Sequence, residues 1–224
     1  MAEGVPVFVQ AKEDNHFKVT VEQLEAARTD KTKVLVLNSP SNPTGMIYSR
    51  EELLAIGNWA VAHDVLILAD DIYGRLVYNG NEFVPISSLS EAIRKQTIVI
   101  NGVSKAYAMT GWRVGYAVGN PEIIAAMSKL TGQTTSNLTA VSQYATIEAL
   151  TGPQDSVETM RKAFEERLNT IYPLLCQVPG FEVVKPQGAF YLFPNVKKAM
   201  EMKGYTDVTE FTTAVSYTHL RAHE

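Results

Sequence analysis

The sequence predicts an α/β protein with a mostly parallel sheet and helices on both faces, followed by part of a smaller α+β domain. The first observation behind this is a series of short apolar runs rich in β-branched residues. They are apolar throughout rather than alternating, which is typical of strands covered on both faces. The runs span residues 5–9, 33–37, 65–69, 97–100 and 114–118.

Segments of helical period lie between these runs, at residues 21–28, 49–63 and 121–129. Ser49 and Glu52 have the spacing of a capping box, in which each side chain accepts a hydrogen bond from the other residue's backbone N–H. The second of these helices should therefore begin at Ser49. Strand and helix in repeated alternation indicate a layered α/β domain.

The second observation is a change of pattern after about residue 150. Leu150-Thr151-Gly152-Pro153 predicts the end of a helix, and a long helical segment follows at residues 155–175. Two short strands are then expected at 181–184 and 189–193. This change indicates a smaller α+β unit that is joined to the first one through the long helix.

Composition and charge exclude several classes of protein. The 224 residues carry 20 Lys and Arg against 24 Asp and Glu, a balance too even for a nucleic-acid-binding surface. A single cysteine, Cys176, excludes an internal disulfide framework and a cysteine-built zinc site. No apolar run approaches the ~18 residues of a membrane span, and no signal-peptide pattern opens the chain. We therefore expect a cytoplasmic protein with neither nucleic acid nor membrane as a partner.

Polar clusters follow three of the predicted strands, at residues 38–45, 69–73 and 101–105. In open α/β sheets, ligands bind beyond the carboxyl ends of the strands, so these clusters should converge at one edge. Taken singly, each cluster is more often structural: a solvated loop lysine, a strand-end cap, a proline turn. Their joint arrangement is what predicts a site.

Other nucleotide and nucleophile sites lack their defining elements here. The sequence contains no G-x-x-x-x-G-K-[ST], no G-x-G-x-x-G after the predicted strands and no H-E-x-x-H. The lysine cluster at 102–106 lacks the second glycine of a nucleophile elbow. No metal site is predicted.

The lysine cluster continues as Gly-Val-Ser-Lys-Ala-Tyr-Ala-Met-Thr-Gly-Trp-Arg-Val-Gly over residues 102–115. This stretch resembles the lysine signature of class I and II aminotransferases, the fold-type I enzymes that depend on pyridoxal 5′-phosphate. Residues 38–45 (Asn-Ser-Pro-Ser-Asn-Pro-Thr-Gly) and 69–73 (Ala-Asp-Asp-Ile-Tyr) resemble two further motifs of that family, in the family's order. The resemblance covers residues 1 to about 215 and is greatest to bacterial aspartate aminotransferases.

The resemblance implies catalytic roles for three residues. Lys105 would form a Schiff base with the cofactor aldehyde and afterwards move the proton between the substrate and the cofactor. Asp70 would pair with the pyridine nitrogen and keep it protonated. Tyr73 would hydrogen-bond to the phenolic oxygen of the cofactor.

Further residues would bind the cofactor. Asn42 would share the phenolic oxygen with Tyr73, and the family places a cis peptide bond at Asn42-Pro43, whereas an X-Pro bond alone has a cis frequency of only ~5%. Ser104 and Arg113 would bind the phosphate, a hydroxyl and a charged fork suited to a dianion.

Three neighbouring residues are expected to have no part in catalysis. Asp71 should point away from Asp70 if the strand geometry persists, since successive side chains alternate in direction. Phe190 and Tyr191 belong to a motif, Pro-Gln-Gly-Ala-Phe-Tyr, that is interpreted as structural. We expect both aromatic rings in the core rather than in contact with substrate.

The implied activity is transfer of an amino group between an amino acid, with aspartate as one candidate, and a 2-oxo acid, by a homodimer. Two alternatives remain: a catalytically incompetent fragment of such an enzyme, or a lyase or decarboxylase of the same fold. Family members are longer at both ends, which supply a phosphate-cupping turn, a stacking aromatic ring, a tyrosine across the dimer interface and an arginine for the substrate carboxylate.

The expected organisation is thus part of a cofactor-binding large domain over residues 1–152 and part of a small domain over 153–215. The family pattern stops beyond Val215. Residues 216–224 are therefore predicted to be a non-native tail.

Overall fold

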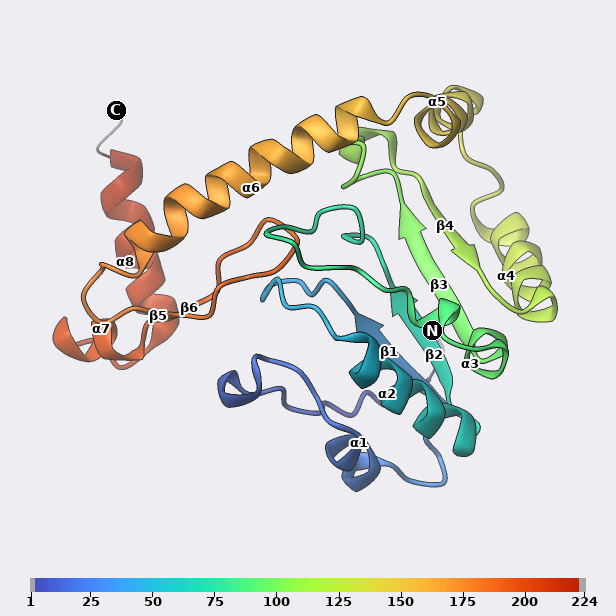
Figure 1. Ribbon diagram of the computed structural model, residues 1–224, viewed down its shortest axis with the longest axis horizontal. Helices are drawn as coiled ribbons and strands as arrows, with labels where there is room; N and C mark the ends of the chain where they lie inside the picture. The colour runs from blue at the N-terminus through green and yellow to red at the C-terminus, as the bar shows by residue number, and fades with distance from the viewer. Residues whose placement is uncertain (1–2, 222–224) are drawn as a thin grey trace.

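The computed structural model describes residues 3–221, and the side chains of residues 3–216. Figure 1 shows a sheet with helices packed beside it, and a long helix, α6, leading from the sheet to a smaller group of elements. The elements are η1 (Glu13–Asn15), α1 (Val21–Ala27), β1 (Val34–Asn38), α2 (Arg50–Ala62), β2 (Leu66–Asp70), η2 (Ile86–Ser88), α3 (Glu91–Lys95), β3 (Thr97–Gly102), η3 (Thr110–Trp112), β4 (Gly115–Val118), α4 (Pro121–Thr134), α5 (Ala140–Thr151), α6 (Asp155–Leu175), β5 (Glu182–Val183), β6 (Pro194–Asn195), α7 (Lys197–Met202) and α8 (Val208–Arg221).

The main sheet has the strand order β1-β2-β3-β4. The first three strands are parallel, with Asn38 of β1 opposite Asp70 of β2 and Asp70 opposite Ile100 of β3. Strand β4 is antiparallel to β3, so that Gly115 lies opposite Gly102. The predicted α/β class with a mostly parallel sheet is confirmed.

Two predicted strands are wrong. Residues 5–9 are extended but pair with no strand in the described structure, and Val5, Val7 and Phe8 are exposed. An apolar β-branched run becomes a strand only if a neighbouring strand offers its edge for hydrogen bonds. The sequence pattern does not report whether such a strand is present. Residues 189–193 form a turn instead of a strand because Ala189 has a left-handed backbone (φ 58°), which a continued strand excludes.

The helix start predicted at Ser49 is confirmed. Ser49 Oγ accepts from the Glu52 N–H at 3.2 Å, and Glu52 Oε2 accepts from the Ser49 N–H at 2.6 Å. Helix α2 then buries its apolar face against β2 and α3, with Ile56 packed in the same cluster as Ile67 and Ile93. Helix α3 was not anticipated, and α5 ends at Thr151, within the predicted helix end at residues 150–153.

The two faces of β1 differ in their cover. Leu37 is 6% exposed and Leu35 packs against the core that α1, α2 and α3 share with the sheet, as Figure 1 shows for α1 and α2. On the opposite face, Val34 is 50% exposed and Val36 is 67% exposed. Among the described residues, β1 is therefore covered on one face only.

Gly45 connects the loop after β1 to the turn between β5 and β6. The Gly45 carbonyl accepts hydrogen bonds from the Gln187 and Gly188 N–H groups, each at 2.9 Å. Gly45 has φ +69°, and a Cβ on it would lie 2.5 Å from Pro186 Cβ and 2.7 Å from the Gly188 oxygen. Only glycine fits this position, for reasons of backbone and of space.

Substitution of Gly45 by alanine should therefore destabilise the protein strongly. Gly80 is a matched control, because it also has positive φ (+75°) but no atom within 4 Å of an added Cβ. The left-handed backbone alone costs alanine about 1 kcal/mol, so Gly80→Ala should lose about that much free energy of unfolding in urea denaturation. Gly45→Ala should lose clearly more, and equal losses would contradict the close contact with Pro186.

Candidate active site

The carboxyl ends of the parallel strands β1, β2 and β3 lie at one edge of the sheet, and polar side chains gather there. Asn38, the last residue of β1, donates from Nδ2 to the Asp70 carbonyl at 3.0 Å. Its Oδ1 accepts from the Asn42 N–H at 2.7 Å. One amide side chain thus ties the loop that carries Asn42 to the end of the strand that carries Asp70.

The proline bonds of this loop are cis at both Ser39-Pro40 and Asn42-Pro43. The cis bond expected before Pro43 is therefore present, and the one before Pro40 was not anticipated.

Asp70 and Asp71 lie in different surroundings. Asp70 is half-buried, and its Oδ1 accepts from the Ile72 N–H at 3.1 Å, so the carboxylate caps the turn that follows β2. Asp71 is 7% exposed. Burial, and secondarily the charge of Asp70, raises the pKa of Asp71 to about 7. Asp71 therefore keeps its proton to a higher pH than an ordinary aspartate does.

Tyr73 is 2% exposed and lies in a hydrogen-bonded cluster. Its hydroxyl oxygen is 2.6 Å from the Tyr191 hydroxyl oxygen. Burial raises the pKa of Tyr73 most, the hydrogen bond with Tyr191 raises it further, and a side-chain hydrogen bond with Asn42 lowers it. Asn42 and Tyr73, predicted as a pair, are in contact.

Lys105 is half-buried beside two aromatic rings. Its Nζ lies 5.7 Å from the ring centre of Tyr73 and 5.4 Å from that of Phe190. Within residues 3–221, this amine has neither a hydrogen bond nor an ion pair. A half-buried amine with no carboxylate partner is placed for covalent chemistry with a carbonyl.

The expectation that Phe190 and Tyr191 lie in the core holds for Tyr191, which is partly buried against the cluster of Tyr73 and Leu168, and is wrong for Phe190. Phe190 packs edge-on against Tyr73, with ring centres 5.4 Å apart, and remains 39% exposed. The left-handed Ala189 turns both aromatic side chains back onto Tyr73, whereas a strand would have sent them to opposite faces. No signal in a single sequence reports that turn.

Ser104 and Arg113 stand apart from this cluster. Arg113 is exposed, follows η3 with φ 55°, and donates from Nη1 to the Thr110 carbonyl at 3.0 Å. In the described part of the chain, no hydrogen bond or ion pair connects either residue to Asp70, Tyr73 or Lys105. The structure brings Asn42, Tyr73 and Lys105 into contact and leaves the two predicted phosphate ligands without a shared partner.

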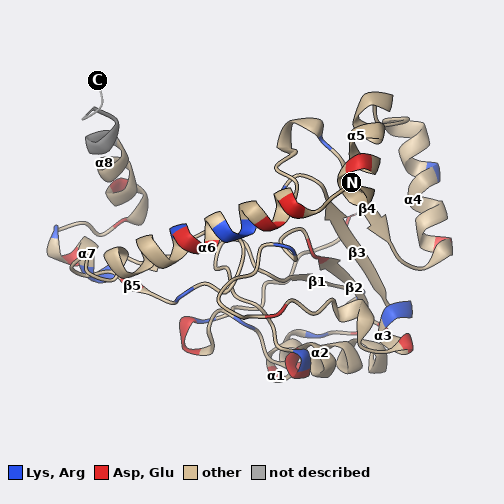
Figure 2. Cartoon of the chain, turned by 45° about the horizontal axis from the view of Figure 1, so that its top comes forward, with Lys and Arg blue, Asp and Glu red and all other residues tan. Residues whose placement is uncertain are grey.

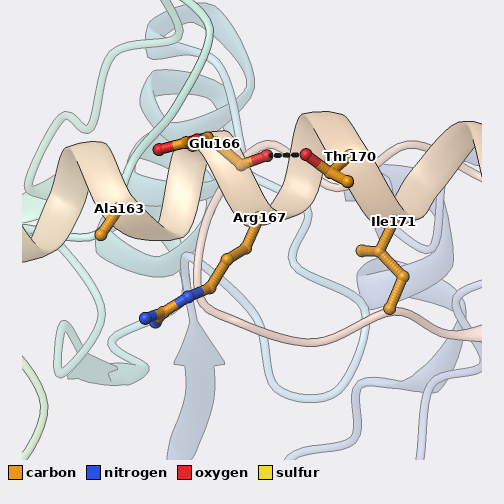
Figure 3. A pocket seen from close by; sticks show the side chains of 5 residues that line it. All are labelled: Ala163, Glu166, Arg167, Thr170 and Ile171. Carbon is orange, nitrogen blue, oxygen red and sulfur yellow. Dashed lines mark hydrogen bonds between the residues drawn. The ribbon is translucent and has the colours of Figure 1, made fainter.

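Two hollows lie elsewhere. Figure 3 shows one along α6, where Thr170 Oγ1 donates to the Glu166 carbonyl at 2.8 Å; its lining is Ala163, Glu166, Arg167, Thr170 and Ile171. The other lies between α6 and the loop after Tyr73, where Arg161 donates to the Val77 carbonyl at 3.2 Å. Figure 2 shows basic and acidic positions, in blue and red, along α6, the helix that carries Arg161. Neither hollow is lined by a predicted site residue.

Among the described residues, no group of three His, Cys, Asp or Glu side chains is placed to hold a metal ion. None of the helices in the described range is long and apolar enough to cross a bilayer.

Solved structures share this fold. An aspartate aminotransferase from Rhizobium meliloti superposes with a TM-score of 0.85 at 40% identity, over 88% of this chain and 49% of that one. An aromatic aminotransferase from Pyrococcus horikoshii gives a TM-score of 0.81 at 36% identity, over 84% and 51%. The fold is that of the fold-type I aminotransferases, a class that depends on pyridoxal phosphate.

Comparison of sequences identifies the family. The family model described as aminotransferase class I and II matches residues 1–219, and the chain belongs to that family. An asparagine–oxo-acid transaminase from Streptococcus mutans is 78% identical over 215 residues, and an aspartate aminotransferase from Bacillus subtilis is 53% identical over 215 residues. Both alignments cover 96% of this chain and 55% of the relative. The chain spans about half the length of these relatives.

The raised pKa of Asp71 predicts a pH dependence of stability. Its pKa is 3.8 without perturbation and about 7 in the fold, so the folded state binds the proton more tightly. The stability that this proton contributes is present below about pH 4 and is lost as the pH rises through about 7. At about 1.4 kcal/mol per pKa unit, the protein should lose about 3 kcal/mol between about pH 5 and pH 8 through this group.

Asp71→Asn should remove that loss, because the amide resembles the neutral acid at every pH. Urea unfolding of both proteins at the two pH values measures it. Asp30→Asn, in an exposed turn, is the control and should keep the wild-type pH dependence. An unchanged pH dependence in Asp71→Asn would exclude Asp71 as its source.

Proposed function

We propose that this chain carries the cofactor-binding centre of an aminotransferase, which transfers an amino group between an amino acid and a 2-oxo acid. The observation that carries the proposal is the unpaired Lys105 amine beside Tyr73, at the sheet edge where Asp70 ends β2. Membership of the class I and II family supports it.

The chemistry of the donor set fits pyridoxal phosphate. A half-buried amine lies beside a phenol–amide pair, with a carboxylate at the end of the neighbouring strand. The hydrogen bond of Arg113 to the Thr110 carbonyl leaves most of its five N–H donors for an anion, and no carboxylate in residues 3–221 pairs with it. Each group that the cofactor presents has a partner of the right kind.

When bound, the cofactor supplies an aldehyde that condenses with amines and a ring that withdraws electrons. Lys105 Nζ would hold the cofactor through its aldehyde carbon, and as a free amine it would carry the proton between the substrate Cα and the cofactor. Asp70 keeps a proton on the ring nitrogen through its negative charge.

Four further side chains would orient the cofactor. Tyr73 and Asn42, which are in contact with each other, would donate hydrogen bonds to its phenolic oxygen. Ser104 and Arg113 would bind the phosphate, to which the guanidinium could offer a bidentate, charge-assisted contact.

The amino donor is proposed from the relatives. One is named for asparagine and several for aspartate, which differ only in the terminal amide or carboxylate of a four-carbon amino acid. We therefore propose a four-carbon dicarboxylic amino acid, or its amide, as donor.

The subunit organisation is also a proposal. We place part of the large domain at residues 1–152, part of the small domain at 153–215 and a non-native tail at 216–224, of which the last three residues lie outside the described ones. A homodimer is supported by apolar side chains exposed on α5, with Val141 68% and Tyr144 75% exposed. A cytoplasmic location remains a prediction.

Reduction with borohydride tests the role of Lys105. After incubation of the chain with pyridoxal phosphate and reduction, peptide mapping should find the label on Lys105, and Lys105→Ala should abolish it. Lys95→Ala is the matched control, because Lys95 is an exposed lysine paired with Glu91, and should keep the label. Labelling spread over surface lysines, or retained in Lys105→Ala, would refute the proposal.

A panel of amino donors tests the reaction. Aspartate or asparagine should convert the bound cofactor to its amine form, seen by absorbance, at least tenfold faster than leucine does, since one methylene or polar group changes selectivity by that order. Labelling of Lys105 without conversion by any donor would favour a catalytically incompetent chain. Release of an elimination or decarboxylation product would favour the lyase alternative.

A further inference from the structure

The contact between Tyr73 and Tyr191 joins two distant parts of the chain. Tyr73 lies in the turn after β2, and Tyr191 lies in the turn between β5 and β6. Their hydroxyl oxygens are 2.6 Å apart and their rings meet at 78°, with centres 5.7 Å apart. Residues of the two proposed domains thus share one hydrogen bond at the candidate site.

Several backbone contacts hold Tyr191 in place. The Ala189 N–H donates to the Leu76 carbonyl at 2.9 Å, and the Tyr78 hydroxyl donates to the Ala189 carbonyl. Val77 and Gly188 form an isolated β-bridge. The position of Tyr191 is therefore set by its neighbours and does not depend on the hydroxyl contact alone.

The hydroxyl of Tyr73 has one proton to donate and two lone pairs to accept with. Either hydroxyl can be the donor in the bond between Tyr73 and Tyr191. Both partners are hydroxyl groups, and the direction of the bond reverses when the two O–H bonds rotate. No heavy atom has to move.

We propose that Tyr191 is a positioning residue that acts through Tyr73. When no ligand is bound, the Tyr191 hydroxyl can accept a hydrogen bond from the Tyr73 hydroxyl. When Tyr73 donates its hydrogen bond to the cofactor's phenolic oxygen, Tyr191 donates one to Tyr73 Oη. The proposal rests on the proposed function. It extends that function by a second phenol, in a chain of hydrogen bonds that runs from the small-domain turn to the cofactor.

The consequence is a tuned acidity at Lys105. A hydroxyl that accepts a hydrogen bond becomes a stronger donor, so Tyr191 strengthens the bond from Tyr73 to the phenolic oxygen. That bond draws negative charge away from the phenolic oxygen and so destabilises a proton on the nitrogen that joins Lys105 to the cofactor. Loss of the Tyr191 hydroxyl should raise the pKa of that nitrogen.

Tyr191→Phe removes the hydroxyl and keeps the ring that packs on Tyr73. Tyr172→Phe is the matched control, since Tyr172 has its own hydroxyl contact, to the Val183 carbonyl at 3.4 Å, at a place remote from Tyr73 in the hydrogen-bond network. In chains loaded with pyridoxal phosphate, absorbance against pH should show a midpoint raised by about half a pH unit in Tyr191→Phe, as expected for one hydrogen bond. Tyr172→Phe should match the wild type.

The double variant separates action through Tyr73 from a general structural effect. In a Tyr73→Phe background, Tyr191→Phe should produce no further shift of the midpoint. An unshifted midpoint in the single variant, or an equal shift in both backgrounds, would overturn the proposal.

A readout without cofactor keeps this test independent of the proposed function. In the unliganded chain labelled with 13C at tyrosine Cζ, the Tyr73 signal should move in Tyr191→Phe and stay in place in Tyr172→Phe. A Tyr73 signal that does not respond to Tyr191→Phe would also overturn the proposal. If the wild-type chain fails to form the borohydride-trapped bond at Lys105, the proposed function fails, and that result is recorded separately from the response of Tyr73.

Discussion

Two backbone hydrogen bonds, from the Gln187 and Gly188 N–H groups to the Gly45 carbonyl, connect the halves of the candidate site. On one side of this junction is the loop that carries Asn42, and on the other is the turn that presents Phe190 and Tyr191 to Tyr73. Both sides come so close at Gly45 that a side chain would overlap with Pro186. The contacts around Lys105 therefore depend on a point where two loops approach each other without a Cβ between them.

The site is built largely from polar groups that are partly or wholly shielded from water, and such groups are stable only when they are paired. Asn38 uses both ends of its amide to connect Asp70 to Asn42, and Tyr73 shares its hydroxyl with Tyr191. Asp71 is different: its pKa of about 7 shows that burial opposes its ionisation. This carboxyl group therefore costs stability at neutral pH.

The chain spans about half the length of its relatives, and its surface is consistent with that share. Val34 and Val36 leave one face of β1 open, and Val141 and Tyr144 leave an apolar face on α5. Exposed apolar side chains of this kind are typical of surfaces that other protein covers. The candidate site is incomplete in a similar way, because among the described residues Arg113 and Ser104 share no hydrogen-bond partner with Lys105.

Sequence alone determined the α/β class with a mostly parallel sheet, and it identified the family, because apolar strand runs and short motifs are local properties. It also placed the start of α2, since a capping box is complete within four residues. Only the tertiary structure decided that Phe190 and Tyr191 face Tyr73 and that residues 5–9 pair with no strand in the described part. The physical reason is that a left-handed residue at Ala189 and a missing neighbouring edge are set by contacts over long sequence separations, which no local pattern encodes.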